Sequence, residues 1–340
     1  MEAPSQVILR NRARLGAGPV LLAGMPADGL AAALRADGLE VRASSPERGV
    51  CNALSGQGIA TAFECVPRVR EDALVILRLP REKERFAMVL HALAASMAAD
   101  ARLWVVGEKR AGINSAAGLL ERRFSAVSRL DSARHCGLYE AATPRQGAPF
   151  RLDAYATTLD VDSGPARLTL CSLPGVFAHG RVDEGTALLL DTLADCPLAG
   201  DVLDFACGTG IVGLSLLQRH AGLRLALLDA SALALEATRR SLELNGLEAR
   251  VVPSDGLREL AGTFDWIVSN PPFHRGVDDD LDTAADFFRR AGTFLRADGK
   301  IVVVFNRHLP YERWARDRFH LVRRLSQNRS FTVIQASKPV

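Results

Sequence analysis

The chain has 340 residues, of which 48% are hydrophobic and 24% are charged. This length exceeds what one hydrophobic core usually organises, so we expect two domains. No apolar run of about 18 residues occurs, and the first residues lack the apolar core of a secretory signal. These features argue against a membrane protein and favour a protein of the cytoplasm.

The six cysteines lie far apart and form no C-x-x-C pair, which disfavours a zinc site and a disulfide framework. We therefore expect no metal, and we expect the thiols to be reduced and mostly buried. They are Cys51, Cys65, Cys136, Cys171, Cys196 and Cys207.

The charge is unevenly distributed, although the net charge is only +3. Residues 1–150 carry 20 Lys and Arg against 15 Asp and Glu, whereas residues 151–340 carry 22 against 24. Only four of the 42 basic residues are lysines. Arginine suits phosphate and stacks on bases, so the excess is compatible with nucleic-acid binding. A bias in the composition of the source genome would produce the same excess of arginine, so charge alone does not decide whether the protein binds nucleic acid.

Two long segments, residues 73–141 and residues 265–336, repeat the same order of patterns. Each begins with a short strand-like run and continues into an amphipathic helix with apolar residues three and four apart. Each then has a β-rich run, LWVVG at 103–107 and IVVVF at 301–305, and ends in a further strand. Alternating strands and helices predict an α/β fold of two tandem Rossmann-like domains, each a mostly parallel sheet with helices on both faces.

The segment ATPRQGAPFRLDA, residues 142–154, is rich in Pro, Gly and polar residues and is typical of a linker. We place the first domain at residues 1–145, the linker at 146–160 and the second domain at 161–340.

The second domain opens its sheet with GDVLDFACGTGIVGLSLLQRH, residues 200–220. A strand at 202–205 runs into a Gly-rich turn and then a helix, so Gly208 and Gly210 allow a ligand to approach the backbone closely. Together with Gly213 they satisfy G-x-G-x-x-G. That pattern suits a dinucleotide, S-adenosylmethionine, or a tight turn that binds nothing.

The following strands distinguish these alternatives. The second strand ends in Asp229, which is placed to accept hydrogen bonds from ribose hydroxyls, and the third ends in Asp255, which suits an adenine amino group. The fourth ends in Asn270, followed by Pro271, Pro272 and Phe273. Open α/β sheets bind ligands at the carboxyl ends of their strands. A dehydrogenase gives no reason for the Asn-Pro-Pro-Phe turn.

The motifs DFACGTG, LLD, PSD and SNPPF resemble those of class I S-adenosylmethionine-dependent methyltransferases that modify an exocyclic or amide nitrogen. Over nearly the whole chain, LWVVGEKRAGINSA, LDSARHCGLYEA and LTLCSLPGVFAHGRVDEGTALLL resemble the bacterial ribosomal RNA small subunit methyltransferase C family. Members of this family are guanine-N2 methyltransferases with two tandem methyltransferase-like domains.

The resemblance implies S-adenosyl-L-methionine as cofactor and a guanine of 16S rRNA as substrate, in the context of the 30S subunit. It also implies an active site in the second domain and a degenerate first domain that docks RNA or supports the second domain. The first domain fits, because LAGMPADGL at 22–30 replaces the Gly-rich turn, and Arg78-Leu79-Pro80 stands where Asn270-Pro271-Pro272 stands in the repeat. An internal duplication is compatible with a monomer.

The chemistry of guanine explains the turn at Asn270. The amino lone pair is delocalised into the ring, so acceptors aimed at both N–H bonds help to draw the nitrogen toward tetrahedral geometry. We expect the Asn270 side-chain oxygen and the Pro271 carbonyl to be these acceptors. The prolines, including Pro272, hold the carbonyl in place, and Phe273 offers a flat face to an extruded base.

The candidate cofactor-binding residues lie at the Gly-rich turn, at the strand ends and in PGVFAHGRVDEG. Asp204 is expected to contact the methionine part or to cap the turn, Phe177 to cover the cofactor and Asp183 to meet its ammonium group, or the last two to be scaffold. His274 is a proton acceptor or an exposed polar residue. The full set is Asp204, Cys207, Gly208, Gly210, Asp229, Asp255, Asn270, Phe177 and Asp183.

Other functions remain open. A sibling family with the same motifs methylates guanine-N2 in 23S rRNA, and related turns serve adenine-N6 DNA methyltransferases and glutamine methyltransferases of release factors, because all these targets are planar NH2 groups. The Asn-Pro-Pro sequence could also be an ordinary turn that ends a strand. The chain could then be a nucleic-acid-binding protein that has kept the fold of an enzyme without its activity.

Overall fold

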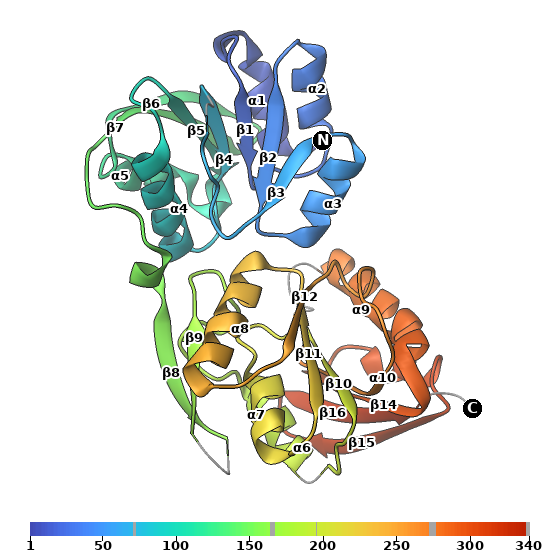
Figure 1. The fold of residues 1–340 in the computed structure, drawn as a ribbon. Coiled ribbons are helices and arrows are strands. Elements are labelled where there is room, and N and C mark those ends of the chain that lie inside the picture. Colours follow the sequence, from blue (N-terminus) through green and yellow to red (C-terminus); the bar gives the residue numbers. More distant parts are fainter. Residues whose placement is uncertain (71–72, 164–166, 195, 272–276, 338–340) are drawn as a thin grey trace. The chain divides into compact units, whose positions relative to one another are not determined.

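The computed structural model describes the chain except for residues 71–72, 164–166, 195, 272–276 and 338–340, and the side chains of 277–283. Two compact units are present, Met1–Tyr155 (unit 1) and Ala156–Val340 (unit 2), and both are seen in Figure 1. Their division falls within the segment 146–160. The end of that segment is not a free linker, because Thr157–Asp162 already forms a strand of unit 2.

Unit 1 contains a seven-stranded sheet in the order β3-β2-β1-β4-β5-β7-β6. Its first five strands are parallel, and β7 is antiparallel to both β5 and β6. The strands are β1 (Val20–Ala23), β2 (Val41–Ser45), β3 (Ala60–Phe63), β4 (Leu74–Arg78), β5 (Arg102–Glu108), β6 (Phe124–Ala133) and β7 (Cys136–Pro144).

Helices cover both faces of this sheet, because neighbouring residues of each strand point to opposite sides. Leu22 packs into a core with helices α1, α2 and α3, whereas Leu21 packs into a second core with α4 and α5. The helices are α1 (Ala3–Arg10), α2 (Leu30–Ala36), α3 (Arg48–Gly56), α4 (Lys83–Ser96) and α5 (Ala116–Leu120), with short 3-10 turns η1 (Arg12–Arg14), η2 (Lys109–Ala111), η3 (Ile113–Ser115) and η4 (Leu152–Tyr155).

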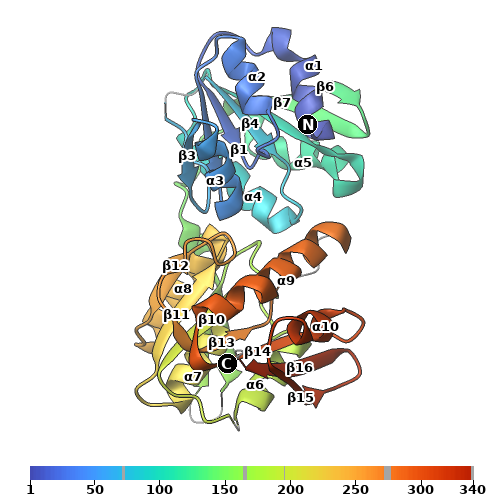
Figure 2. The same ribbon diagram turned by 90° about the vertical axis from the view of Figure 1, so that its right-hand side faces the viewer.

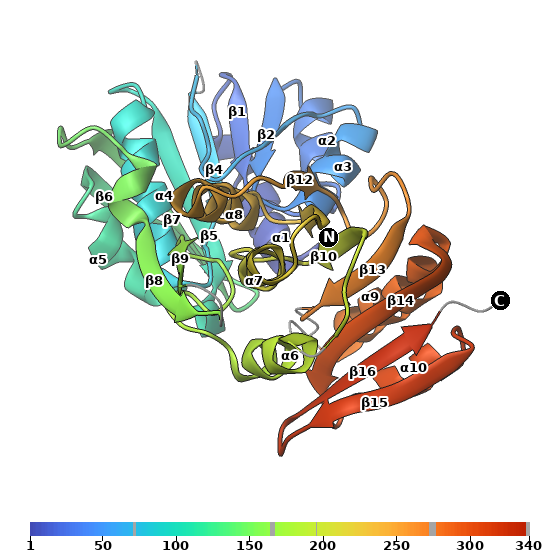
Figure 3. The same ribbon diagram turned by 60° about the horizontal axis from the view of Figure 1, so that its bottom comes forward.

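Unit 2 repeats this sheet in the order β12-β11-β10-β13-β14-β16-β15. Again five strands are parallel and β16 is antiparallel to β14 and β15; these three strands are labelled together in Figure 3. The strands are β10 (Asp201–Phe205), β11 (Arg224–Asp229), β12 (Arg250–Pro253), β13 (Phe264–Ser269), β14 (Leu295–Asn306), β15 (Leu321–Gln327) and β16 (Phe331–Ser337).

Helices α9 and α10 pack on one face of this sheet (Figure 2), and α6, α7 and α8 pack on the other. The second face also carries an antiparallel hairpin, β8 (Thr157–Asp162) and β9 (Arg167–Ser172), which has no counterpart among the described residues of unit 1. The helices are α6 (Glu184–Ala194), α7 (Ile211–Arg219), α8 (Ala232–Asn245), α9 (Val277–Ala291) and α10 (Tyr311–Arg316), with the 3-10 turn η5 (Gly292–Phe294). The predicted fold of two tandem Rossmann-like domains is confirmed.

All six cysteines lie in described residues and form no disulfide with one another, and four of them are buried as expected: Cys51, Cys136, Cys171 and Cys207. Within the described part of the chain, no helix is both long and apolar enough to cross a bilayer.

Candidate active site

Three neighbouring strands of unit 2 bring the candidate residues together. β10 lies between β11 and β13, and Phe205 pairs with Leu228 on one side and Ser269 on the other. The carboxyl ends of the three parallel strands therefore meet at one edge of the sheet. A pocket at this edge is lined by the Gly-rich turn, the strand ends and the loop between β9 and α6. The predicted residues that line it are Asp204, Cys207, Gly208, Asp229, Asn270, Phe177 and Asp183.

The Gly-rich turn contains a run of left-handed backbone. Ala206 and Gly208 both have φ of 60°, and Gly210 has φ of 83°. A Cβ added to Gly208 would meet nothing within 4 Å, so this position is open to a ligand. At Gly210, by contrast, a Cβ would lie 2.8 Å from Leu214 and 3.3 Å from Thr238. Gly210 is thus required by the packing of the turn against its own helices, and the expected close approach of a ligand applies to Gly208.

Asp204 is the most deeply buried carboxyl of the site, with 1% of its surface exposed. Burial raises its pKa to about 7, the backbone N–H of Gly213 donates a hydrogen bond of 2.9 Å that lowers the pKa, and the negative charge of Asp229 raises it. A cationic ligand in the pocket would favour the ionised form of Asp204. The carboxyl of Asp204 therefore caps the helix after the turn, and it can become ionised when a cationic ligand binds.

Asp229 links the end of β11 to the Gly-rich turn. Its Oδ2 accepts a hydrogen bond of 3.0 Å from the N–H of Gly208, and its Oδ1 accepts one of 2.9 Å from the N–H of Ser231. A carboxylate oxygen can accept more than one hydrogen bond, so these contacts hold the group in place without exhausting it.

Cys207 lies within the same turn and is 5% exposed. Its Sγ lies 3.5 Å from the hydroxyl of Thr238, which donates a hydrogen bond of 2.9 Å to the carbonyl of Gly208. Burial and the charges of Asp229 and Asp204 raise the pKa of the thiol, so Cys207 is a neutral packing residue at the pocket wall.

Asn270 lies at the end of β13 and is held by two acceptors. Its Nδ2 donates hydrogen bonds of 3.1 Å to Oδ2 of Asp183 and 2.8 Å to Oγ1 of Thr186. The same Asp183 oxygen accepts the N–H groups of Gly185 and Thr186 and so caps α6. Asn270 and Asp183, which were predicted to serve different ligands, are thus in direct contact.

The loop between β9 and α6 contributes two exposed side chains to the pocket. Phe177 is 50% exposed, and the next residue, Ala178, has φ of 53°. Arg181 was not singled out from the sequence. Among the described residues that line the pocket, it is the only one with a cationic side chain. Its position between two predicted residues, Phe177 and Asp183, was the available signal.

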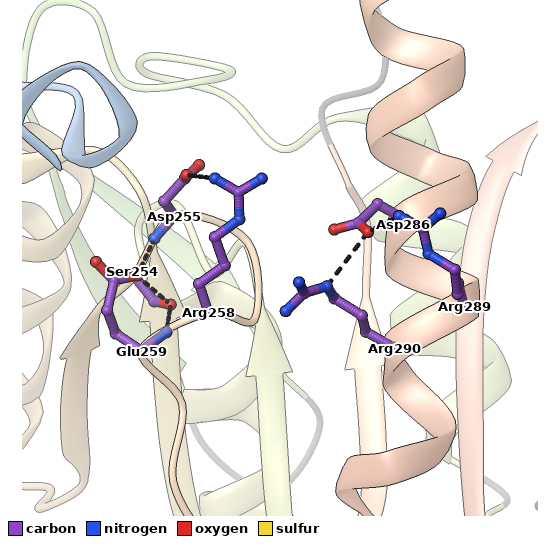
Figure 4. A network of polar contacts seen from close by, with 7 residues as sticks. All are labelled: Ser254, Asp255, Arg258, Glu259, Asp286, Arg289 and Arg290. Carbon is purple, nitrogen blue, oxygen red and sulfur yellow. Dashed lines mark hydrogen bonds and ion pairs between the residues drawn. The ribbon is translucent and has the colours of Figure 1, made fainter. Parts of the chain in front are cut away.

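Asp255 belongs to a different network, drawn in Figure 4. Its Oδ2 accepts a hydrogen bond of 2.7 Å from Arg258, and its N–H donates one of 2.7 Å to Glu259, which also accepts from Ser254. Asp255 is not among the described lining residues of the pocket. The bond from Arg258 leaves acceptor capacity on both oxygens of Asp255 for an adenine amino group.

The same close-up shows a second group of charges on α9, where Asp286 is paired with Arg289 and Arg290. These pairs stay within one helix, and the exposed side chains of Arg258 and Arg289 make this edge of unit 2 basic as well as acidic.

Part of the Asn-Pro-Pro-Phe turn lies outside the described residues, namely Pro272, Phe273 and also His274. Pro271 is described and is buried. The hydroxyl of Ser269 donates a hydrogen bond of 2.7 Å to the carbonyl of Phe205, which fastens the end of β13 to β10 just before the turn.

Comparisons with known proteins agree with this architecture. The family described as Methyltransferase small domain matches residues 167–335, and the one described as Methyltransferase small domain N-terminal matches residues 5–159. A solved structure of the T. thermophilus 16S rRNA N2 methyltransferase, in complex with AdoMet and guanosine, superposes with a TM-score of 0.83 at 23% identity. It covers 95% of this chain and 89% of that one, and it shows the same fold.

Curated relatives are more similar in sequence. The Ribosomal RNA small subunit methyltransferase C of Pseudomonas entomophila is 41% identical over 315 residues, 92% of each chain. The protein of the same name from Hahella chejuensis is 36% identical over 340 residues, 98% of each chain. As its motifs predict, the chain belongs to the ribosomal RNA small subunit methyltransferase C family.

Proposed function

We propose that this S-adenosylmethionine-dependent methyltransferase acts on the exocyclic N2 of a guanine in 16S rRNA, within the small ribosomal subunit. The observation that carries the proposal is Asn270, an amide held rigidly at the end of β13 beside the pocket. Relatives with 41% and 36% identity bear the corresponding name. We further propose that the protein works as a monomer in the cytoplasm and needs no metal.

The pocket suits S-adenosylmethionine by its donor set. The cofactor, which supplies the methyl group when bound, carries a sulfonium and an ammonium as well as a carboxylate. The pocket offers the carboxyl groups of Asp204 and Asp229 to the positive charges and the ribose hydroxyls, and Arg181 to the negative charge. The open space at Gly208 leaves room for the ligand against the backbone. We propose that Phe177 covers the cofactor, that Cys207 packs against it and that Asp255 reaches its adenine.

The chain's own residues prepare the guanine rather than attack it. We propose that Asn270 Oδ1 and the Pro271 carbonyl accept the two N–H bonds of the amine and so favour its tetrahedral geometry. Pro272 fixes the backbone that carries these acceptors, and Phe273 stacks on the extruded base. Most of the remaining acceleration then comes from holding the nitrogen in line with the methyl group.

The test is methyl transfer with isolated small subunits, naked 16S rRNA, large subunits and peptide release factor as parallel substrates. Mass mapping of the product should place one methyl group on guanine-N2 of the small-subunit RNA. Modification of the large subunit would identify the 23S guanine-N2 activity instead, and modification of release factor would overturn the RNA assignment.

A further inference from the structure

We infer that Asp183 and Thr186 are positioning residues that orient the Asn270 amide, so that its oxygen faces the target amine. This inference rests on the proposed function, because it concerns the group that would accept the guanine N–H bonds. It assigns Asp183 to the orientation of Asn270, whereas sequence reasoning offered it to the ammonium group of the cofactor.

The chemistry of the acceptors determines which end of the amide points toward them. The Asn270 side chain lies with one end 3.1 Å from Oδ2 of Asp183 and 2.8 Å from the Thr186 hydroxyl. An ionised carboxylate only accepts hydrogen bonds, so the end facing Asp183 must be the NH2 group. Each of the two N–H bonds of that group then has its own acceptor, and Oδ1 faces away from both.

The two acceptors are themselves held firmly by the first turn of α6. Oδ2 of Asp183 accepts the N–H of Gly185 at 2.9 Å and that of Thr186 at 3.2 Å. A Cβ at position 185 would lie 3.0 Å from this same oxygen, so the glycine leaves room for the carboxylate. Thr186 is 6% exposed, so its hydroxyl has little freedom to turn toward water.

The orientation matters because an amide turned by half a rotation would present NH2 to the NH2 of guanine. Two donors would then face each other, and the stabilisation of the developing tetrahedral nitrogen would be lost. Asp183 makes this rotation costly, since it would leave the acceptor-only carboxylate facing the amide oxygen. In the present orientation the Thr186 hydroxyl accepts from the same NH2 group and helps to hold the amide at its angle. Asp183 and Thr186 therefore keep the NH2 group of Asn270 away from the substrate and its oxygen toward the substrate.

Substitutions at the two positions separate orientation from cofactor binding. Thr186→Val keeps the shape and removes one acceptor, and we expect kcat to fall about tenfold, while Asp183→Ala should lower it about a hundredfold. Asp183→Asn keeps an oxygen where Oδ2 now accepts all three hydrogen bonds, and it should restore kcat to within about threefold of the wild type. Cofactor Kd, measured by calorimetry, should change by less than about threefold in all three variants.

Ala187→Gly is the matched control for a weakened helix. Ala187 is exposed and follows Thr186 in α6, and its side chain makes no hydrogen bond to Asn270. The substitution should lower Tm without lowering kcat. A kcat loss in this control equal to that of Thr186→Val would show that the helix, rather than the amide orientation, is responsible and would overturn the inference.

A double-mutant cycle gives the decisive readout. In an Asn270→Ala background, Thr186→Val should have no further effect on kcat, because the group that it orients is gone. Additive losses would overturn the inference, as would an Asp183→Asn enzyme whose cofactor Kd is weakened as much as that of Asp183→Ala. Failure of the proposed function would look different, since the wild-type enzyme itself would then leave guanine-N2 unmethylated.

Discussion

The two units have the same strand order, yet their corresponding strand ends carry different chemistry. Gly24 and Ala206, which have φ of 64° and 60° just after β1 and β10, match Leu22 with Asp204. The registers extend the match, because Leu22 pairs with Ile76 and Ala43 in unit 1, and Asp204 pairs with Val268 and Leu227 in unit 2. The buried carboxyl of unit 2 is thus replaced by an apolar core residue of unit 1. By the same registers Ser45 stands where Asp229 stands, and Arg78 stands where Asn270 stands.

Each unit contains an equivalent internal contact, in which the residue just before a helix bonds to the residue at a strand end, although the chemical groups differ. Glu2 immediately precedes α1 and pairs with Arg78 at 2.6 Å, just as Asp183 immediately precedes α6 and accepts from Asn270. The helices correspond, because α1 packs on β5 and β7 and α6 packs on β14 and β16. In unit 1 the strand-end residue is a cation whose charge is neutralised, whereas in unit 2 it is an amide that keeps a polar end for a ligand.

This difference shows that the sheet determines where the strand-end residues lie but not whether they form a binding site. The two units keep the same strand order although Leu22, Ser45 and Arg78 stand in unit 1 where Asp204, Asp229 and Asn270 stand in unit 2. The strand order therefore does not depend on which side chains occupy these positions. We therefore propose that unit 1 binds no cofactor and that it docks RNA or supports unit 2. The excess of basic residues in the first 150 residues favours docking.

The largest expected effect comes from replacing Asn270 with alanine, and the same replacement at Arg78 is the comparison. Asn270→Ala should lower single-turnover methylation by roughly a hundredfold or more, because one preorganised acceptor is lost. Cofactor affinity should remain nearly unchanged. Arg78→Ala, at the corresponding position of unit 1, should methylate at the wild-type rate. Equal losses in both variants would contradict the assignment of chemistry to unit 2.

The second effect concerns the buried carboxyl that unit 1 lacks. Asp204→Asn should weaken cofactor affinity by about thirtyfold, the loss expected for one hydrogen bond to a charged group. In the wild type, cofactor affinity should fall as pH drops below about 7, the pKa of this carboxyl, because the neutral form no longer attracts a cation. The variant should lose this part of the pH dependence, which calorimetric titrations at several pH values would measure.

The same substitution should raise stability. The pKa of Asp204 is raised from 3.8 to about 7, so the folded protein binds more protons than the unfolded chain between these values. The free energy of unfolding therefore falls as pH rises through this window, and Asp204→Asn should recover on the order of 4 kcal/mol above it. Denaturant unfolding at pH 5 and pH 8 should show a larger gain at pH 8. A gain that is independent of pH would contradict the burial argument.

The strand ends could be predicted from the sequence because the relevant signals are local. A Gly-rich turn after one strand and Asp229 and Asn270 after two others are each readable within a few residues, and the parallel sheet then brings them together. The duplication was also visible, since the apolar patterns of 73–141 and 265–336 are similar in spacing.

The remaining features depend on contacts between distant residues. Asp183 and Asn270 are 87 positions apart, and neither side chain reveals its partner in the sequence. The role of Gly210 depends on Leu214 in the following helix and also on Thr238 on another helix. The hairpin β8–β9 interrupts the repeat, and only its alternating pattern from Thr157 to Asp162 could have shown that a strand begins within the segment predicted as a linker.

A third test compares the residues at the ends of β2 and β11. Asp229→Asn should weaken cofactor binding by about tenfold, because one charge-assisted contact is weakened, whereas Ser45→Ala should have no effect. Calorimetry on the whole chain should also give one cofactor per chain. Two cofactors per chain, or a loss of affinity in Ser45→Ala, would mean that unit 1 has kept a binding site.

The smallest effect is expected at Arg181, the cationic side chain that lines the pocket of unit 2. We expect it to bind the cofactor carboxylate, since the other charged groups described there, Asp183, Asp204 and Asp229, are acids. The side chain is exposed, so water screens the interaction and Arg181→Gln should weaken S-adenosylmethionine binding by only about fivefold. Decarboxylated S-adenosylmethionine has no group for Arg181 to bind, so its Kd should be the same for the wild type and the variant. If Arg181→Gln weakened both ligands equally, the arginine would act on the shape of the loop between Phe177 and Asp183 and not on the carboxylate.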